Sequence, residues 1–377
     1  MLGDLEPDGD RAFEHVRELT QTIGPRVAGT PGEIAARDYI ARTLESYGYD
    51  VEIQEFAFDG TRYRTSSVTV GSTPYRAVAL SGSSSGNVSG PLVVAGIGRP
   101  EQFPSGGLAG AIALIERGEL TFTQKAQNAQ DAGAGGVIIY NNQDGPLIAP
   151  SDALDIPAAG ITRADGMALI GRAGTTAAVD VPPPADQAFN VIARPAGVTT
   201  CSTVTGGHYD SVPAVQAADD NASGTSGVIE LARVAAANGL PGANCFVLFG
   251  AEEFGLFGSL AFVESMSDAE LNGLRAMLNL DVIGTDVEMT LIGSDDMVEL
   301  ARIEAQEAGV EATRGNVPSG SGSDHFSFER AGVPVVFFYR HDPLIHTERD
   351  AINRILPESL EDTIRVAYGV LEALNAG

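Results

Sequence analysis

The sequence is poor in several residue types. Its 377 residues include no tryptophan, a single lysine (Lys125) and two cysteines. The cysteines, at positions 201 and 245, are too far apart in the sequence to form the close pair of a zinc finger. No stretch of about 18 apolar residues occurs, so no membrane span is expected. The first residues do not combine a basic region with an apolar run, so no signal peptide is predicted in this sequence.

Positive charge is also scarce. Lys and Arg total 23 against 50 Asp and Glu, which gives a net charge of −27. A surface of this charge repels polyanions, so binding of nucleic acid is not expected, whereas cations are attracted. An acidic, lysine-poor composition suits high salt, where screening relieves self-repulsion. A GC-rich coding bias would produce the same composition.

The remaining composition is that of a globular protein, with 44% hydrophobic and 19% charged residues. The length predicts about two to three domains. Residues 64–183 are rich in Gly, Ser and short apolar runs, contain one helical pattern at about 123–133, and end in the proline-rich stretch 181–184. We therefore predict a β-rich domain over 64–183, inserted into a discontinuous domain of residues 1–63 and 184–377.

Strand and helix patterns alternate from residue 187 onward. Apolar strands are predicted to end at His208, near Gly250, at Asp281 and near Tyr339, with helices between them at about 224–237, 255–265 and 294–308. This alternation predicts an α/β fold with a mixed, mainly parallel twisted sheet flanked by helices. Ligands of such sheets bind at the carboxyl ends of the strands.

Acidic residues and histidines follow the predicted strand ends. The clusters are His208-Tyr209-Asp210, Asp219-Asp220-Asn221, Glu252-Glu253, Asn279-Leu280-Asp281 and, in a late loop, His346. Imidazole and carboxylate together suit Zn²⁺. Each cluster alone has a structural explanation, such as a helix cap at Asp219-Asp220-Asn221. All of them, however, fall where a parallel sheet would gather them, and five ligands with one shared carboxylate are enough for two metal ions.

These motifs resemble those of the M28 peptidase family, the co-catalytic dizinc aminopeptidases. The resemblance rests on order, spacing and local sequence, including the 12 residues from His208 to Asp220 and the Asn-x-Asp-x-Ile-Gly segment at 279–284. It covers roughly residues 10–60 and 187–377 and implies the zinc-exopeptidase fold.

The predicted insertion resembles a second known unit. Its segments 110–118 and 132–138 are similar to the protease-associated (PA) domain. That domain is commonly inserted into M28 enzymes and usually has no catalytic residues.

The M28 resemblance also implies a role for each motif residue. One zinc would be held by His208 and Asp281 and the other by Glu253 and His346, with Asp220 bridging the two. Glu252 would be the general base and not a ligand. Asp210 would hydrogen-bond to His208 and fix its tautomer. The peptide bond between Asp220 and Asn221 would be cis.

One position departs from the family pattern. Ile345 precedes the last histidine, where some M28 members have a tyrosine that donates to the oxyanion. Tyr339 or His325 could take this role or contact the substrate.

The two cysteines each lie seven residues before a motif residue, Cys201 before His208 and Cys245 before Glu252. On neighbouring parallel strands, equal distances would bring the two sulfurs to similar depth, where they could form a disulfide. A disulfide would indicate an oxidising compartment, so we expect a secreted or extracytoplasmic protein. Two buried free thiols are the alternative, and a cytoplasmic location stays open.

The sequence therefore predicts a dizinc metallo-aminopeptidase that hydrolyses the N-terminal peptide bond of peptides. A carboxypeptidase or a glutaminyl cyclase on the same scaffold is the close alternative. The cyclases keep one zinc, and a carboxypeptidase should have a basic cluster, for which only Arg340 and Arg349 lie near His346. A non-catalytic receptor module is the alternative from a different class, and the presence of Glu252 disfavours it. The oligomeric state and the preferred N-terminal residue have no signal in the sequence.

Overall fold

The computed structural model describes residues 5–317 and 322–376, so the first four residues, which gave no signal-peptide pattern, lie outside it. The chain divides into two compact units. The first consists of Met1–Phe58, Gln187–Val212 and Gln216–Gly377, and the second of Asp59–Asp186 with Pro213–Val215. Within the described ranges, no helix has the length and apolar character needed to cross a membrane.

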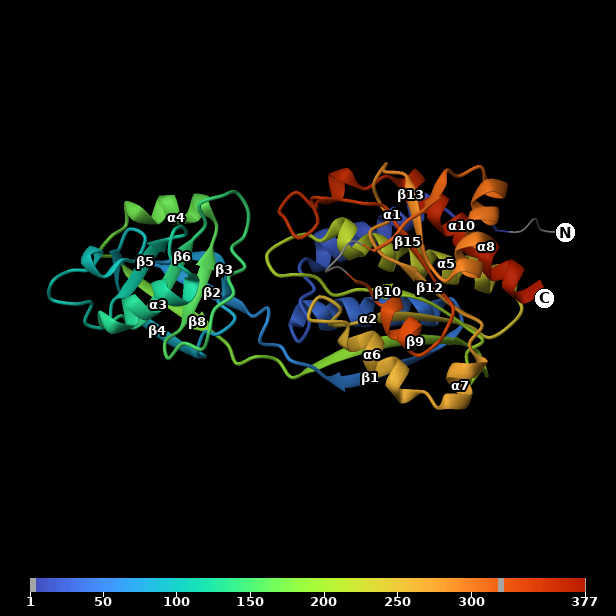
Figure 1. Ribbon diagram of the computed structural model, residues 1–377, viewed down its shortest axis with the longest axis horizontal. Coiled ribbons are helices and arrows are strands. Elements are labelled where there is room, and N and C mark those ends of the chain that lie inside the picture. The colour runs from blue at the N-terminus through green and yellow to red at the C-terminus, as the bar shows by residue number, and fades with distance from the viewer. Residues whose placement is uncertain (1–4, 318–321, 377) are drawn as a thin grey trace. The chain divides into compact units, whose positions relative to one another are not determined.

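An eight-stranded sheet forms the centre of the first unit (Figure 1). In spatial order its strands are β1 (Tyr49–Ala57), β9 (Gln187–Pro195), β11 (Asn244–Phe249), β10 (Thr203–His208), β12 (Ala276–Leu280), β15 (Val335–Tyr339), β13 (Met289–Gly293) and β14 (Ala312–Arg314). The four central strands β11, β10, β12 and β15 are parallel, whereas β1, β9 and β13 each have an antiparallel neighbour. The predicted mixed, mainly parallel sheet is thereby confirmed.

Helices cover both faces of this sheet. On one face lie α1 (Gly9–Arg17), α2 (Pro31–Ser46), α5 (Gly224–Asn238), α8 (Asp295–Ala308) and α10 (Pro357–Ala376), and on the other α6 (Phe257–Ser265) and α9 (His325–Arg330). The short helix α7 (Asp268–Gly273) follows α6. Successive residues of β11 serve the two faces in turn: Phe246 and Leu248 belong to one core, and Cys245 and Val247 to the other. Strands β11, β12 and β15 have mainly apolar residues because both of their faces are buried, whereas β10 is buried with threonine and glycine.

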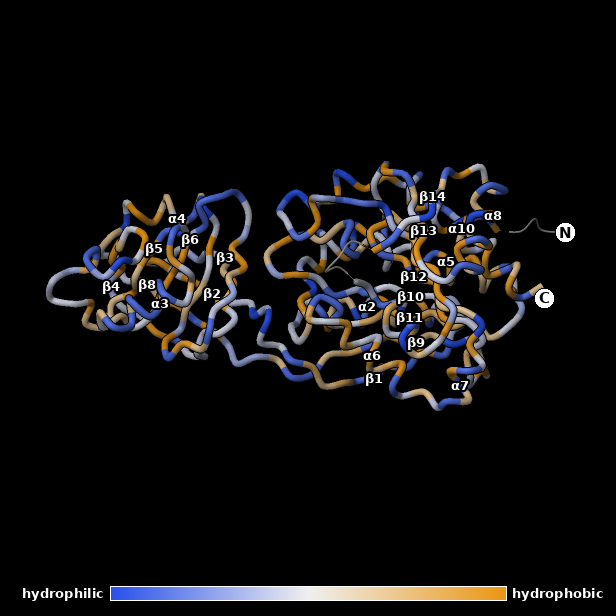
Figure 2. The backbone as a smooth tube through the Cα atoms, in the orientation of Figure 1, coloured by the Kyte–Doolittle hydropathy of each residue, from blue (hydrophilic) through white to orange (hydrophobic). Residues whose placement is uncertain are grey.

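The second unit is a closed barrel, in agreement with the expected β-rich insertion. Its strands follow the order β2 (Thr65–Val70), β3 (Thr73–Ala79), β7 (Ala158–Ile161), β6 (Gly136–Tyr140), β5 (Ile112–Glu116), β4 (Gly86–Val94) and β8 (Thr176–Val181). Two helices, α3 (Phe122–Asp131) and α4 (Arg163–Ile170), complete it. Strand β5 again separates two cores, with Ile112 and Leu114 on one side and Ala113 and Ile115 on the other. Figure 2 shows this concentration of apolar residues on the strands of each unit.

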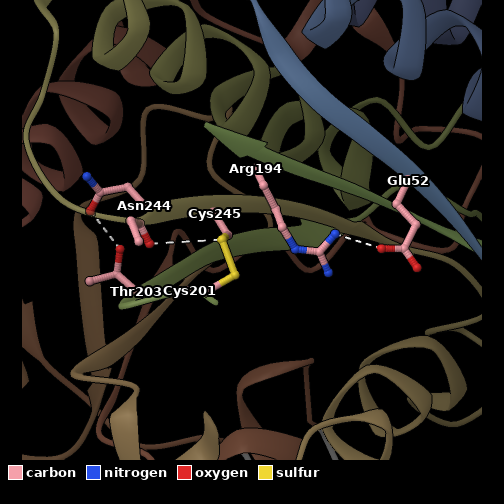
Figure 3. The surroundings of a disulfide bond; sticks show 7 residues. Glu52, Arg194, Cys201, Thr203, Asn244 and Cys245 are labelled. Atoms are coloured by element: carbon pink, nitrogen blue, oxygen red, sulfur yellow. Dashed lines mark hydrogen bonds and ion pairs between the residues drawn. A yellow bond between two sulfur atoms is a disulfide. The ribbon is translucent and has the colours of Figure 1, made fainter. Parts of the chain in front are cut away.

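A disulfide joins Cys201 and Cys245 near the beginnings of β10 and β11 (Figure 3). The disulfide is present, but the strand register differs from the expected one, in which Cys201 and Cys245 would lie level on the two strands. Cys245 pairs with Val204, and His208 pairs with Phe249, so His208 is not level with Glu252 along the strands. Cys201 lies just before β10, where the Ser202 N–H donates to the Ala243 carbonyl and turns the chain toward β11.

Candidate metal centre

The carboxyl ends of three adjacent parallel strands bring most of the predicted site residues together. His208 is the last residue of β10, and Asp281 directly follows β12. Because Gly206 pairs with Asn279, the register carries His208 opposite Asp281. Glu252 and Glu253 lie in the loop after β11. Each of these residues lies at or just after the carboxyl end of a buried strand.

Asp220 reaches the centre from the turn Ala218–Ser223, which precedes α5. The peptide bond between Asp220 and Asn221 is cis. The Asn221 amide donates to the Leu280 carbonyl (3.0 Å), and its oxygen accepts from the N–H groups of Gly224 and Val282. A Cβ atom at Gly224 would lie 2.1 Å from the Leu280 oxygen, so only glycine allows α5 to begin this close to β12.

His346 lies in the loop after β15 and has a positive φ of 60°. Its side chain is 45% exposed, whereas Asp220 and Glu253, which face it, are 7% and 4% exposed. The centre is therefore open to solvent on the side of His346, while its other walls are buried.

The five predicted ligands form two clusters that share one carboxylate. In the first cluster, Nε2 of His208 lies 3.1 Å from Oδ1 of Asp220 and 3.4 Å from Oδ1 of Asp281. In the second, Nε2 of His346 lies 2.9 Å from Oδ2 of Asp220 and 3.1 Å from Oε2 of Glu253. Each cluster thus offers three ligand atoms close to one another, and Asp220 presents a different oxygen to each cluster.

The spacing and the chemistry of these groups fit zinc. Two ligand atoms at 2.0–2.2 Å from a tetrahedral Zn²⁺ lie roughly 3.3 Å apart, close to the four distances above. Oδ1 of Asp281 is buried and has no hydrogen-bond partner among the described residues. A buried polar atom without a partner often marks the place of an ion. Imidazole and carboxylate donors together are the set that zinc commonly takes.

An excess of carboxylates dominates the electrostatics. Burial lowers the pKa of His346, but hydrogen bonds to Asp220 and Glu253 outweigh burial and raise the pKa to about 12. Burial also lowers the pKa of His208, yet Asp281 and Glu252 raise it well above its usual value. Burial and then Asp220 raise the pKa of Glu253 to about 7. All three shifts show that the buried carboxylates require positive charge nearby.

Asp210 holds the Glu252-Glu253 pair in addition to facing His208. Its carboxylate accepts from the backbone N–H groups of Glu252 (3.0 Å) and Glu253 (3.3 Å). Its Oδ1 lies 3.5 Å from Nδ1 of His208, while its own backbone carbonyl lies closer to that nitrogen, at 3.2 Å. The sequence suggested only the contact with His208, because the contacts to Glu252 and Glu253 span more than 40 residues.

The two candidates for the oxyanion or substrate contact differ in their surroundings. His325 is 1% exposed, stacks on Phe337 with ring centroids 4.7 Å apart, and has a pKa lowered to about 4 by burial. The Tyr339 hydroxyl is hydrogen-bonded to Nδ1 of His341 (3.1 Å). Burial, followed by Asp281 and Asp220, raises the pKa of Tyr339 to about 12, so this phenol lies within the field of the metal centre.

Two polar residues at the centre had no recognised sequence signal. The Ser323 hydroxyl donates to Oδ2 of Asp281 and accepts from the Asn279 amide, both at 2.7 Å. Asp350 accepts from the backbone of Asp219 and Asp220. Ser323 lies two residues before His325, one of the two candidates for the oxyanion or substrate contact. Asp350 lies four residues after His346, and no pattern singles it out.

Two family descriptions match the chain. Residues 190–371 match peptidase family M28, and residues 88–169 match the PA domain. Among curated relatives, the aminopeptidase YwaD of Bacillus subtilis is 34% identical over 93% of this chain and 81% of its own length. A probable lipoprotein aminopeptidase of Mycobacterium tuberculosis, LpqL, is 34% identical over 73% of this chain, which spans 59% of that relative.

Solved structures agree with these matches. BSAP, a zinc aminopeptidase from Bacillus subtilis, superposes with a TM-score of 0.74 at 30% identity, covering 98% of this chain and 96% of that chain. An aminopeptidase from an Aneurinibacillus strain has a TM-score of 0.61 at 31% identity, covering 98% and 94%. A glutaminyl cyclase from Fimbriiglobus ruber shares the fold at 17% identity, with a TM-score of 0.59 and 99% and 97% coverage.

Proposed function

The chain belongs to peptidase family M28 and is a zinc aminopeptidase, and from this premise we propose that it binds two zinc ions and hydrolyses the N-terminal peptide bond of peptides. The observation that carries the proposal is the sharing of Asp220, whose two carboxylate oxygens face two different clusters of buried ligand atoms.

The ligands divide between the two ions according to these clusters. His208 and Asp281 would hold one zinc, Glu253 and His346 would hold the other, and Asp220 would contribute one oxygen to each. The distances of 2.9–3.4 Å between ligand atoms support this assignment. When bound, the zinc pair supplies a Lewis acid that polarises the scissile carbonyl and increases the acidity of water.

Glu252 is the general base of the reaction. Burial raises the pKa of its carboxyl well above the usual value, and Glu253 and Asp324 raise it further, although His208 lowers it. The carboxylate of Glu252 takes a proton from the attacking water and returns it to the leaving amine. The two hydrogen bonds to Asp210 fix the backbone of Glu252 and Glu253. The side chain of Glu252 can therefore serve as the base while that of Glu253 serves as a ligand.

The charge of the site supports recognition of a free N-terminus. Four carboxylates, those of Asp220, Glu252, Glu253 and Asp281, surround a centre that is open beside His346. Two bound Zn²⁺ would offset the charge of these four carboxylates, so the attraction of a positively charged α-amine comes from the acidic chain as a whole, with its net charge of −27, and an acetylated amine does not gain from it.

Tyr339 is the better candidate for the contact with the oxyanion or the substrate. Its phenol lies within the field of Asp281 and Asp220 and is oriented by His341. His325 is almost fully buried against Phe337, which leaves a substrate little access to its ring.

Arg340, one of the two arginines near His346, is not available to a substrate carboxylate. Arg340 is 6% exposed and donates to the Val287 carbonyl. Its position supports the aminopeptidase assignment over a carboxypeptidase.

We also propose the location and the domain boundaries. An extracytoplasmic location is supported by the disulfide between Cys201 and Cys245 and by the relative named as a probable lipoprotein. The PA insertion runs over residues 64–183 within a peptidase domain of residues 1–63 and 184–377. Support comes from the barrel strands, which begin at Thr65 and end at Val181.

A panel of aminoacyl-nitroanilides, each free and N-acetylated, tests the proposed reaction. We expect cleavage of the free substrates, loss of cleavage with a chelator, and recovery with Zn²⁺. Equal cleavage of the acetylated substrates would reject an exopeptidase that reads the α-amine. Metal analysis of the active protein should give two zinc ions per chain, and a stoichiometry of one would reject the shared site.

A further inference from the structure

Two buried charged residues that are not among the proposed metal ligands, Arg26 and Asp350, hold the backbone that leads to Asp220. They come from opposite ends of the chain and are 0% and 1% exposed. Neither is a candidate ligand, and neither belongs to the reaction described above.

Arg26 binds backbone carbonyls on both sides of a loop. Its Nε donates to the carbonyl of Tyr209 (2.8 Å) and its Nη2 to that of Ala217 (2.9 Å). Nη1 donates to three further carbonyls, at 3.2–3.3 Å, those of Leu19, Gly24 and Gln216. The guanidinium therefore ties the residue after His208 to the segment before Asp220, and it satisfies its donors entirely on the main chain.

Asp350 binds the next stretch of the same segment. Its Oδ1 accepts from the Asp219 N–H (2.7 Å) and its Oδ2 from the Asp220 N–H (3.2 Å). Its own N–H donates to the Thr347 carbonyl (3.0 Å), within the loop that carries His346. One carboxylate thus links the loop of one ligand to the backbone of the shared ligand, across 130 residues of sequence.

The segment between the two contacts would not take its conformation unaided. Ala217 is in the left-handed region, with φ 51° and ψ 55°. This conformation is unfavourable for a residue with a Cβ atom. Arg26 holds the carbonyl of Ala217, and Asp350 holds the N–H groups of the second and third residues after it.

The charge of Arg26 also reaches the centre. Burial lowers the pKa of Arg26 to about 10, while Asp350, Asp210, Asp220 and Glu253 act in the opposite direction. Two of these four carboxylates are proposed ligands, so the guanidinium offsets part of their mutual repulsion.

We propose that Arg26 and Asp350 are positioning residues, which set Asp220 so that its two oxygens face both clusters before any metal binds. The proposal rests on the ligand assignment above. A preset ligand loses little freedom when the metal binds, so the affinity for metal is higher than with a loose loop. Residues that orient ligands in this way typically change metal affinity by 10–100-fold when they are replaced.

The test is a metal titration of apo protein, in which ZnCl₂ competes with a chromophoric chelator. We expect Asp350→Asn and Arg26→Lys each to weaken zinc binding about 10–100-fold. The double variant should lose less than the product of the two single losses, because both residues hold one segment. Titration with Co²⁺ should show altered absorption bands in the variants, since the bands report the geometry of the ligands.

Two controls separate positioning from general stability. Arg349→Gln changes an exposed charge next to Asp350 and should keep the wild-type zinc affinity. A double Cys201→Ala/Cys245→Ala variant lowers stability at the far ends of β10 and β11 and should also keep it.

The outcomes are distinct. Wild-type zinc affinity and cobalt spectra in folded Asp350→Asn and Arg26→Lys would overturn the positioning role. The role is equally overturned if zinc binding in these variants weakens only as much as in the disulfide variant. If Asp350→Asn does not fold, Arg26→Lys decides alone, since it keeps the charge and loses donors. A wild-type protein that binds no zinc would instead overturn the proposed function.

Discussion

At the scale of single residues, Asp210 acts on both halves of the centre at once. It faces Nδ1 of His208, and it also binds the backbone of Glu252 and Glu253. A proposed ligand and the proposed general base therefore depend on one buried carboxylate, although Asp210 itself belongs to neither cluster of ligand atoms. The buried carboxylate of Asp210 thus helps to position residues with different roles. Single substitutions at those residues should therefore affect metal binding and proton transfer separately.

Glu252→Gln should separate these two functions. The amide cannot accept the proton of the attacking water, so we expect kcat to fall about 10²–10⁴-fold. The zinc content should stay at the wild-type value, because Glu252 lies in neither ligand cluster. Steady-state kinetics and metal analysis of the same preparation measure both quantities. A fully active Glu252→Gln enzyme would remove Glu252 from its role, and Glu348→Gln, an exposed change near His346, is the matched control.

His15 should make the fold sensitive to acid. Burial, followed by Arg11 and Arg233, lowers its pKa to about 4, against 6.5 in an unfolded chain. Between these values the unfolded chain binds a proton that the folded chain does not, so stability falls as the pH drops from 6.5 toward 4. At pH 5 the loss amounts to about 2 kcal/mol.

Replacement of this imidazole tests the effect. His15→Phe keeps a ring beside Tyr39 and removes the titrating group. Urea unfolding of both proteins at pH 7.5 and pH 5 should show a smaller acid-induced loss in the variant, by about 2 kcal/mol. Equal losses in the two proteins would show that His15 takes up no proton on unfolding.

At the scale of elements, the proposed metal-site residues lie at the carboxyl ends of β10 and β11, and the disulfide lies near the beginnings of the same strands. His208 and the Glu252-Glu253 loop follow β10 and β11, while Cys201 and Cys245 lie near the other ends of the same strands. The two halves of the strands therefore have separate tasks, so a change at one end should leave the other end intact.

Removal of the disulfide tests this separation. The bond closes a loop of 44 residues, for which loss of loop-closure entropy predicts about 4 kcal/mol. The Cys201→Ala/Cys245→Ala variant should lose about 2–4 kcal/mol of unfolding free energy in denaturant and keep its kcat/KM. An unfolding free energy equal to that of the wild type would contradict the assignment of the effect to the bond. The same conclusion would follow if a reductant lowered the stability of this variant, which has no disulfide, as much as that of the wild type.

At the scale of the whole molecule, charge is the dominant property. A net charge of −27 makes the folded chain repel itself, and salt screens this repulsion. The metal centre benefits from the same excess, because it attracts cations and amines. Stability and attraction of substrate should therefore respond to salt in opposite directions.

Raising NaCl from about 0.05 M to 1 M should raise the Tm of the zinc-loaded protein by at least about 2 °C, since screening relieves self-repulsion. Over the same range, kcat/KM for a cationic N-terminal substrate should fall. Thermal scans and initial rates in one buffer series measure both. A Tm that decreases with salt would contradict the charge argument, and sucrose, which does not screen charge, serves as the control.

The central sheet and the order of the site residues could be predicted from the amino-acid pattern alone. Buried parallel strands are apolar on both faces, so β11, β12 and β15 are visible as mainly apolar runs, each followed by polar residues, whereas β10 is recognised by the His208 motif at its end. Strands β9, β13 and β14 of the sheet and strands β3, β7 and β8 of the barrel were not predicted, because strands that depend on their neighbours have little pattern of their own.

The contacts that hold the site in place became visible only in the folded molecule. The register sets His208 level with Phe249 and not with Glu252, and nothing in either strand alone specifies it. Asp350, Ser323 and Arg26 act through hydrogen bonds to groups 42 to 191 residues away. Such bonds produce no characteristic residue spacing in the sequence, because any polar side chain that folding brings within hydrogen-bond distance can make them.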